Sequence, residues 1–326
     1  MRMLLKAIGY TITFLTLLAL GLYLLGPYEE SDLTAQFDEG LLDDGVARYL
    51  QSVEAAFDDI TPGVQKRVIW AGAPEARTPW AVVYLHGFSA TSEEIRPVPD
   101  QVAEALGANL VYTRLKGHGR GGDALAEASL SDWMSDTAEA LAIGREIGDR
   151  VLVLSVSTGG TLSAAAALDE ELSRDVAGMV LMSPNFGINN PLAPLLTWPA
   201  ARIWLPPLAG AERSWEPHNE AQGKYWTTRY PSVAGLTVAA LVKEVTSRDL
   251  SQIDIPALFI YTNEDQVVVP AATAEVADRW GGPTETLQPT MGPGDDPSSH
   301  VIAGDILSPS QNEATTAAIV TWARGL

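Results

Sequence analysis

The 326-residue chain contains no cysteine. Disulfide bonds, cysteine-ligated zinc, iron–sulfur clusters and a thiol nucleophile are therefore excluded, although the redox compartment is left open. A side-chain nucleophile, if the chain has one, is to be sought among its hydroxyl groups.

Basic residues are scarce, with 21 Lys and Arg against 41 Asp and Glu and a formal net charge of −20. Nucleic acids are bound through clustered Lys and Arg, so this balance argues against a nucleic-acid partner. Apolar residues make up 46% of the chain and charged residues 19%, which allows a large buried core and excludes general disorder.

Charge is absent altogether from residues 7–26, a run of 20 residues. As a helix this run is about 30 Å long, the thickness of a bilayer's hydrocarbon core. Arg2 and Lys6 precede it, and three acidic residues follow within positions 29–32. Because basic residues favour the cytoplasmic side, residues 1–26 are predicted to form a transmembrane anchor with a cytoplasmic N-terminus and a periplasmic or extracellular remainder.

A cleaved signal peptide is the alternative, and it would leave a secreted protein. The apolar run exceeds the usual ~7–15 residues of such a peptide, and no A-x-A-like site ends it. A buried globular helix normally has a polar stripe, which this run lacks. Residues 27–326 hold 19 basic and 41 acidic residues, a net charge of −22, and should be repelled by anionic lipid surfaces.

Residues 27–65 form an acidic connector, predicted to be helical because apolar residues recur near helical spacing between positions 41 and 57. From residue 66 onward, short apolar runs alternate with helical stretches. The predicted strands are 80–85, 109–112, 151–155, 179–182, 257–261 and 285–287, and the predicted helices are 93–106, 130–147, 161–172, 271–280 and 310–324. This alternation predicts one α/β domain over residues 66–326, with a mostly parallel central sheet covered by helices on both faces.

The interval between Met182 and Ile255 is longer than a crossover helix needs and contains four of the nine tryptophans. It is predicted to insert a helical cap, about residues 186–253, over the C-terminal edge of the sheet; a longer helical layer would explain the same interval. Trp198 and Trp204 predict an apolar substrate pocket under the cap. Packing of the cap against the sheet explains these two residues equally well.

A serine lies where the predicted strand 151–155 turns into a small-residue helix, in the sequence Val156-Ser157-Thr158-Gly159-Gly160. Small neighbours permit the sharp turn that lifts the Ser157 hydroxyl above the sheet, and the following helix N-terminus favours developing negative charge. A serine in a tight turn more often caps a helix, so this pattern is weak when taken alone.

The predicted strand 80–85 supports the functional interpretation, because it ends in His86-Gly87-Phe88. A glycine there allows the Phe88 N–H to face the serine. Together with the Thr158 N–H it would supply two donors for an oxyanion. The His86 side chain itself is expected to be hydrogen-bonded within its loop.

Acidic residues follow the predicted strand 257–261, where open α/β sheets place catalytic groups. Asp265 is the candidate acid, Glu264 competes with it, and an ordinary solvated acid is the alternative. Of the four histidines only His300 follows this acid, which gives the chain order Ser157, Asp265, His300. Asp295-Asp296 is expected to be a solvated loop tip rather than a calcium site, and no metal or cofactor is predicted.

These pieces resemble the α/β-hydrolases, most closely the branch of monoacylglycerol lipases, lysophospholipases and related small serine hydrolases. The resemblance covers about residues 66–326 and rests on the ordered motifs LHGF (85–88), KGHGR (116–120), SVSTGG (155–160), NEDQVVVP (263–270) and SSHV (298–301). It implies that Ser157 is a nucleophile in a catalytic triad with Asp265 and His300. It also implies that the backbones of Phe88 and Thr158 form the oxyanion hole.

One residue departs from the family pattern, because Ser155 stands where the usual Gly-x-Ser-x-Gly elbow begins with glycine. Serine is small, so the turn is expected to be kept. Its hydroxyl must fit beside the histidine loop, so the replacement is expected to affect the catalytic rate more than the fold. Relatives that dehalogenate use an aspartate nucleophile, so Ser157 argues against that chemistry.

The resemblance implies hydrolysis of carboxylic esters through an acyl-enzyme, and an anchor beside an apolar pocket favours lipid-derived monoesters such as monoacylglycerol or lysophospholipid. Two alternatives stay open: an aminopeptidase or amidase on the same scaffold, and a non-catalytic membrane-tethered binding protein. The sequence does not determine the oligomeric state.

Overall fold

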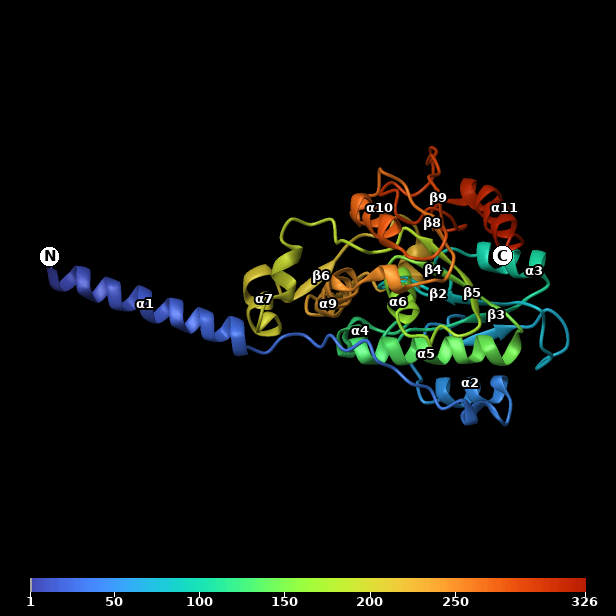
Figure 1. Ribbon diagram of the computed structural model, residues 1–326, viewed down its shortest axis with the longest axis horizontal. Coiled ribbons are helices and arrows are strands. Elements are labelled where there is room, and N and C mark those ends of the chain that lie inside the picture. Colours follow the sequence, from blue (N-terminus) through green and yellow to red (C-terminus); the bar gives the residue numbers. More distant parts are fainter. Residues whose placement is uncertain (1) are drawn as a thin grey trace.

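The computed structural model describes residues 2–326, in which seven strands form one sheet in the order β1-β3-β2-β4-β5-β8-β9 (Figure 1). The strands are β1 (Arg67–Ile69), β2 (Ala81–Leu85), β3 (Asn109–Tyr112), β4 (Val151–Val156), β5 (Val176–Met182), β8 (Ala257–Ile260) and β9 (Thr284–Leu287). Strand β1 is antiparallel to β3, and the other neighbours are parallel. The prediction of a mostly parallel central sheet is confirmed.

The helices are α1 (Arg2–Leu25), α2 (Val46–Glu54), α3 (Val98–Leu106), α4 (Gly122–Glu127), α5 (Leu130–Ile147), α6 (Thr158–Ala167), α7 (Ala201–Ala209), α8 (Glu220–Tyr225), α9 (Ala234–Ser247), α10 (Pro270–Arg279) and α11 (Asn312–Ala323). Short 3₁₀ helices, η1 to η4, lie at Glu39–Leu42, Ala193–Thr197, Leu250–Gln252 and Pro309–Gln311. A second small sheet pairs β6 (Glu212–Ser214) with β7 (Arg229–Pro231).

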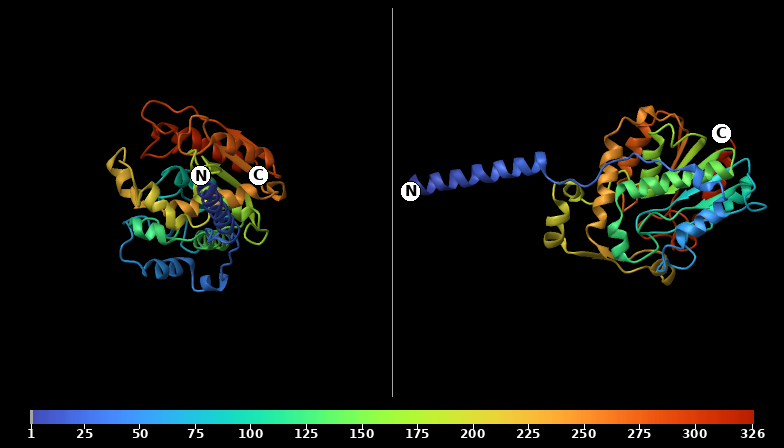
Figure 2. Two further views of the ribbon diagram at one scale, coloured as in Figure 1. Left: turned by 90° about the vertical axis from the view of Figure 1, so that its left-hand side faces the viewer. Right: turned by 90° about the horizontal axis from the view of Figure 1, so that it is seen from below.

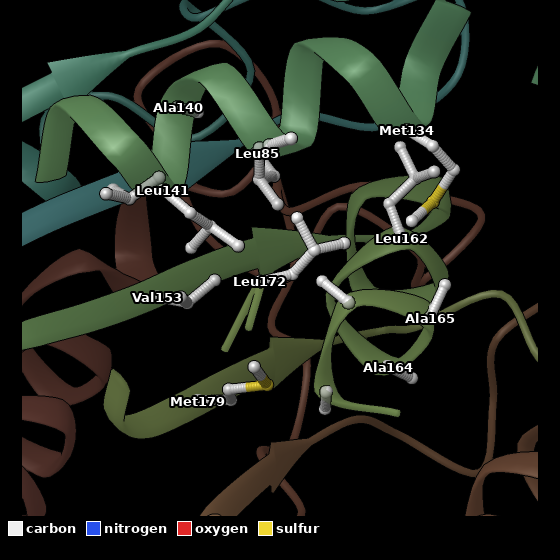
Figure 3. Close-up of a cluster of buried hydrophobic side chains, with 14 of the residues drawn as sticks. Leu85, Met134, Ala140, Leu141, Val153, Leu162, Ala164, Ala165, Leu172 and Met179 are labelled. Carbon is white, nitrogen blue, oxygen red and sulfur yellow. The ribbon is translucent and has the colours of Figure 1, made fainter. Parts of the chain in front are cut away.

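The central strands are apolar along nearly their whole length, as is typical of a sheet that is covered on both faces. In β2, Val83 and Leu85 pack on the side of α5, α6, α9 and α10, whereas Val82 and Tyr84 pack on the side of α3 and α11. Figure 3 shows part of the first layer, where side chains of β2, β4 and β5 meet those of α5 and α6. The two buried layers hold the carboxyl ends of the parallel strands at one edge, where the loops of the candidate site lie.

Helix α3 begins later than the sequence pattern predicts. The prediction placed its start at residue 93, but Glu93 and Glu94 lie in the loop and the helix begins at Val98. Pro97 explains the difference, because a residue that precedes proline avoids the helical conformation, which keeps Arg96 out of the helix. The loop after β2 is therefore longer than predicted and reaches the edge of the sheet.

The segment 27–65 is helical only at η1 and α2. Its first part is extended, and Leu33, Ala35 and Phe37 pack against the core with the two-residue period of an extended chain. In the helical part, Leu42, Val46 and Leu50 belong to the same buried cluster as the sheet, so the connector packs as part of the main body.

Helix α1 projects away from this body in Figure 1 and in the right-hand view of Figure 2. None of its described residues is buried, and within residues 2–326 it is the single helix long and apolar enough to cross a membrane. Length and composition alone are compatible with a membrane anchor or with a signal sequence.

The end of α2 is fastened to the loop after β3 by a buried ion pair. The Arg114 guanidinium donates to Glu54 at both ends of the carboxylate, with Nη2–Oε1 at 2.7 Å and Nε–Oε2 at 3.0 Å. The side chains are only 4% and 8% exposed, so both charges are largely shielded from water.

We expect Glu54→Ala to lower the free energy of unfolding by about 3–5 kcal/mol, because it leaves the Arg114 guanidinium buried without a charged partner. Adding Arg114→Met should restore part of that loss. The measurement is denaturant-induced unfolding of the full chain in detergent, followed by tryptophan fluorescence. As a control, Glu212→Ala removes an exposed partner of Arg229 and should cost less than about 1 kcal/mol; equal losses in the two single variants would contradict the expectation.

Candidate active site

Ser157 sits on a sharp turn between β4 and α6. Its backbone has φ 52° and ψ −117°, a conformation that costs a residue other than glycine about 1–3 kcal/mol. The turn is held from both sides: the Ser157 N–H donates to the Met182 carbonyl at 3.0 Å, and the Asn185 N–H donates to the Ser157 carbonyl at 3.0 Å. The strain is therefore maintained by the end of β5 and the loop after it.

Gly159 allows α6 to start directly against the end of β2. A Cβ atom at this position would lie 2.2 Å from the carbonyl oxygen of Leu85, so every residue with a side chain would push the helix and the strand apart. This close approach brings the serine beside the loop that follows β2.

His300 connects the serine with an acid. Its Nε2 lies 3.0 Å from the Ser157 Oγ, and its Nδ1 lies 2.8 Å from Oδ2 of Asp265. The structure thus brings together the three side chains that the sequence places in the order Ser157, Asp265, His300. Their assignment as nucleophile, acid and base stays a prediction.

The other oxygen of Asp265 accepts hydrogen bonds from the Val267 and Val268 N–H groups, at 2.8 and 2.9 Å. This leaves Oδ2 directed at the imidazole. Glu264, its competitor in sequence, is exposed, so the geometry selects Asp265.

The imidazole of His300 is more basic than usual. Burial lowers the pKa of His300, but the hydrogen bond and the negative charge of Asp265 outweigh it, so that the pKa lies above its ordinary value. A histidine held this way accepts a proton from a neighbouring hydroxyl more readily.

The prediction of a solvated acidic tip at Asp295-Asp296 is wrong. Asp296 is buried, and its Oδ2 accepts the backbone N–H groups of His300 and Val301 at 3.0 and 2.9 Å. The carboxylate folds the loop back on itself and thereby positions the histidine. An aspartate four residues before the histidine in a Gly- and Pro-rich loop is the signal that could have indicated this role.

Phe88 and Thr158, the two predicted oxyanion donors, line the same cavity as Ser157. As expected, His86 is bonded within its loop: its Nδ1–H donates to the Gly87 carbonyl at 2.9 Å, and its Nε2 accepts the Leu115 N–H at 3.1 Å. Burial lowers the pKa of His86 to about 4, so the ring stays neutral and fixes the orientation of the peptide that carries the Phe88 N–H.

Ser155 does not crowd the histidine loop. Its hydroxyl donates to the Val180 carbonyl on the neighbouring strand β5, at 3.0 Å. The hydroxyl is therefore satisfied within the sheet, and the serine elbow beside it keeps its turn.

The cavity above these residues has a volume of about 620 Å³. Its wall combines apolar side chains with polar and charged ones, among them Arg213, Glu216 and Asp296, and most of it comes from the interval that the sequence assigns to the cap. The apolar lining residues are Phe88, Ile188, Leu196, Leu205, Trp215, Trp226, Tyr230, Val238, Val267, Val301 and Leu307.

The two predicted pocket tryptophans do not line this cavity. Trp198 is 55% exposed, and Trp204 packs in a small cluster with Ala201 and Leu205 while its Nε1–H donates to the Pro199 carbonyl at 3.0 Å. Both lie around the start of α7, which turns them away from the catalytic edge. Trp215 and Trp226, from the same interval, take the place predicted for them.

Within residues 2–326, neither His118 nor His218 forms a hydrogen bond with Ser157. His118 is buried against His86 and Phe88, with ring centroids 4.8 and 5.9 Å apart, and burial lowers its pKa. His218 is exposed at the cavity. Within residues 2–326 there is no group of three or more His, Asp or Glu side chains that could hold a metal ion.

Comparison with known proteins agrees with this architecture. The family model described as "Serine aminopeptidase, S33" matches residues 76–290, more than half of the chain. A thermostable monoacylglycerol lipase from Bacillus sp. (strain H-257) is 27% identical over 192 residues, which cover 59% of this chain and 73% of that protein.

Solved structures share the fold. One solved structure comes from work on LipS and LipT, two metagenome-derived lipolytic enzymes. Its TM-score is 0.64 at 21% identity, and the match covers 82% of this chain and 100% of that chain. A soluble variant of monoglyceride lipase from Saccharomyces cerevisiae, in complex with a substrate analogue, has a TM-score of 0.60 at 11% identity, covering 82% and 96%. The chain belongs to the S33 serine aminopeptidase family of α/β-hydrolases, and it is a lipase- and esterase-type member that resembles monoacylglycerol lipases.

Proposed function

We propose that this protein hydrolyses carboxylic esters through an acyl-enzyme on Ser157. The observation that supports the proposal best is the hydrogen-bonded series from the Ser157 Oγ through His300 to Asp265 at the floor of a partly apolar cavity. Such a series activates a serine hydroxyl, because the imidazole takes the proton as the oxygen attacks.

The reaction has two steps. Oγ attacks the ester carbonyl carbon while His300 Nε2 accepts the hydroxyl proton, and Asp265 stabilises the imidazolium. The N–H groups of Phe88 and Thr158 bind the tetrahedral oxyanion, each contributing about 3 kcal/mol. The alcohol leaves with the proton from His300, and a water molecule, deprotonated by the same imidazole, releases the acid.

The substrate class we propose is a lipid-derived monoester, such as a monoacylglycerol or a lysophospholipid. Two observations support it: the apolar wall of the cavity suits one acyl chain, and the Bacillus relative is a monoacylglycerol lipase. An amidase or aminopeptidase reaction remains the second candidate, because the family description names aminopeptidases and the same triad cleaves amides. Higher turnover of peptides than of esters would favour that candidate.

We further propose that residues 1–26 anchor the protein in a membrane, with the N-terminus in the cytoplasm and the catalytic domain outside. The chain that leaves α1 is fastened to the segment beside α7: the Ala200 N–H donates to the Pro27 carbonyl at 2.6 Å, and the Arg202 Nε donates to Glu29 at 2.8 Å. Figure 2 shows α7 on the side of the body from which α1 departs.

Large apolar side chains are exposed on that same side of the cap. Their exposed fractions run from 55% to 79%, and they are Leu192, Trp198, Ile203 and Leu208. Apolar surface next to a membrane-spanning helix is buried in the interface of the bilayer rather than left in water. We infer that this face, the α7 face, rests on the membrane.

Ser157→Ala should abolish hydrolysis of p-nitrophenyl butyrate and labelling by a fluorophosphonate probe, because within residues 2–326 Ser157 carries the one hydroxyl that is hydrogen-bonded to His300. Ser155→Ala is the matched control: it removes a buried hydroxyl two residues away that bonds only to Val180. It should keep labelling and activity and lower the free energy of unfolding by about 1 kcal/mol. Undiminished labelling of Ser157→Ala would refute the assignment of Ser157 as the nucleophile.

Ile203→Asp with Leu208→Asp should reduce hydrolysis of long-chain monoacylglycerol in zwitterionic vesicles at least several-fold, because the α7 face then no longer enters the interface. Hydrolysis of water-soluble monobutyrin by the same variant should not change. Leu41→Asp, at a comparably exposed residue on η1, is the control. If the parent chain hydrolyses acetyl esters faster than long-chain acyl esters, the proposed class of lipid-derived substrates is wrong.

Alkaline phosphatase fused to the C-terminus should be active in a bacterial host, because its disulfide bonds form only after export. The fusion should sediment with the membranes. Inactive phosphatase would contradict the orientation, and active phosphatase in the soluble fraction would show that the N-terminal segment is cleaved.

A further inference from the structure

A second carboxyl group, that of Glu94, lies in the cavity beside the serine. Glu94 belongs to the loop between β2 and α3, is 2% exposed and lines the same cavity as Ser157 and His300. The triad mechanism leaves it without a role, and it does not contact Asp265.

The two oxygens of Glu94 have different surroundings. Oε2 accepts the Gly87 N–H at 2.7 Å and the Tyr84 hydroxyl at 3.1 Å. Oε1 accepts no hydrogen bond from any side chain or backbone group of residues 2–326. One carboxyl oxygen is thus saturated with donors, and the other is free to bind something that enters the cavity.

Gly87 places the free oxygen next to the nucleophile. A Cβ atom on this glycine would lie 2.7 Å from Oε1 of Glu94 and 3.1 Å from Cβ of Ser157. The two groups therefore flank the same small space, and only a residue without a side chain leaves that space open. This space adjoins the peptide that carries the Phe88 N–H.

The burial of Glu94 favours its neutral form. Within residues 2–326 no Lys or Arg forms an ion pair with it. Burial raises the pKa of Glu94 to about 7, although the Gly87 N–H, the charge of His300 and the Tyr84 hydroxyl act in the opposite direction. Because Oε2 already accepts two donors, the proton of the neutral acid resides on Oε1.

We propose that Glu94 acts as a neutral acid whose Oε1–H donates a hydrogen bond to an oxygen atom of the bound ester, beside the N–H groups of Phe88 and Thr158. The inference rests on the proposed ester hydrolysis and makes Glu94 a further catalytic residue of that reaction. Ionised Glu94 has the opposite effect, because its charge lies next to the oxyanion that forms in the same space and opposes it.

The pH dependence of kcat/KM follows from two groups that must be neutral together. His300 has to be deprotonated, so activity rises with pH through the histidine pKa. Glu94 has to be protonated, so activity falls as pH rises through about 7. The groups that face Glu94 are His300 and Tyr84, with Tyr112 and Glu93 next to Tyr84. The profile is a bell whose two apparent pKa values belong to the coupled pair.

Glu94→Gln tests this directly. Glutamine keeps an acceptor for Gly87 and Tyr84 and a donor at the position of Oε1, but it cannot ionise. Monobutyrin hydrolysis by the full chain in detergent is followed across pH 5 to about 9 by chromatography of the released acid. We expect kcat/KM to fall by up to tenfold per pH unit on the alkaline side of the parent profile, and to reach a plateau there in Glu94→Gln. An alkaline decline identical in both proteins would overturn the proposal.

Two further variants separate catalysis from folding. Glu94→Met removes the donor and should lower kcat about 10²- to 10³-fold at every pH, with circular dichroism and melting temperature showing that the protein is folded. Tyr84→Phe removes a donor that stabilises the ionised carboxylate, so it should keep the bell and move its alkaline limb to higher pH. A folded Glu94→Met variant with the parent kcat would also overturn the proposal.

An infrared difference spectrum between acidic and alkaline solution gives a readout other than activity, because the carbonyl band of a buried neutral acid should vanish in Glu94→Gln.

The outcomes also distinguish this inference from the proposed function. If Ser157→Ala hydrolyses monobutyrin as the parent does, the proposed function fails. If Ser157→Ala is inactive and Glu94→Gln keeps the parent profile, only the role of Glu94 fails.

Discussion

The strained turn at Ser157 is the constraint on which the arrangement of the site depends. A positive φ at a residue with a side chain costs about 1–3 kcal/mol, and it persists here because β5 and its following loop hold both ends of the residue. Gly159, packed on the Leu85 carbonyl, sets the distance between α6 and β2. With that distance fixed, the loop after β2 brings the Phe88 peptide and the Glu94 carboxyl to the serine, and the loops after β8 and β9 bring the acid and the histidine.

Carboxyl groups surround the site in three different roles, and the hydrogen bonds they accept distinguish them. Asp265 accepts two backbone N–H groups on one oxygen and faces the imidazole with the other. Asp296 accepts backbone N–H groups only and shapes the histidine loop. Glu94 has one oxygen without a donor inside the cavity. A carboxylate with backbone donors keeps its charge, whereas a buried one with few donors tends to take up a proton.

The parts of this molecule that could be predicted from sequence are those that depend on continuous local patterns. Strands that are covered on both faces appear in the sequence as apolar runs, so β3 at 109–112 is found as predicted. Ser157 on its turn and His300 near the C-terminus could be picked out from their order along the chain. The orientation of Trp198 and Trp204 could not be predicted, because it depends on how α7 packs and not on the composition of the interval. The burial of Asp296 and the loop position of Glu94 depend on backbone hydrogen bonds and on the proline before α3, which apolar periodicity does not register.

In the membrane arrangement proposed above, the charge of the body and the position of α1 act together. A body with a net charge of −22 is repelled by anionic lipid, so electrostatics alone would keep the cavity away from the bilayer. The hydrogen bond from Ala200 to Pro27 and the ion pair of Arg202 with Glu29 oppose this by tying the cap to the end of α1. The exposed side chains of the α7 face carry no charge themselves. In that arrangement the α7 face contacts lipid through apolar area, while the acidic remainder of the body stays on the water side.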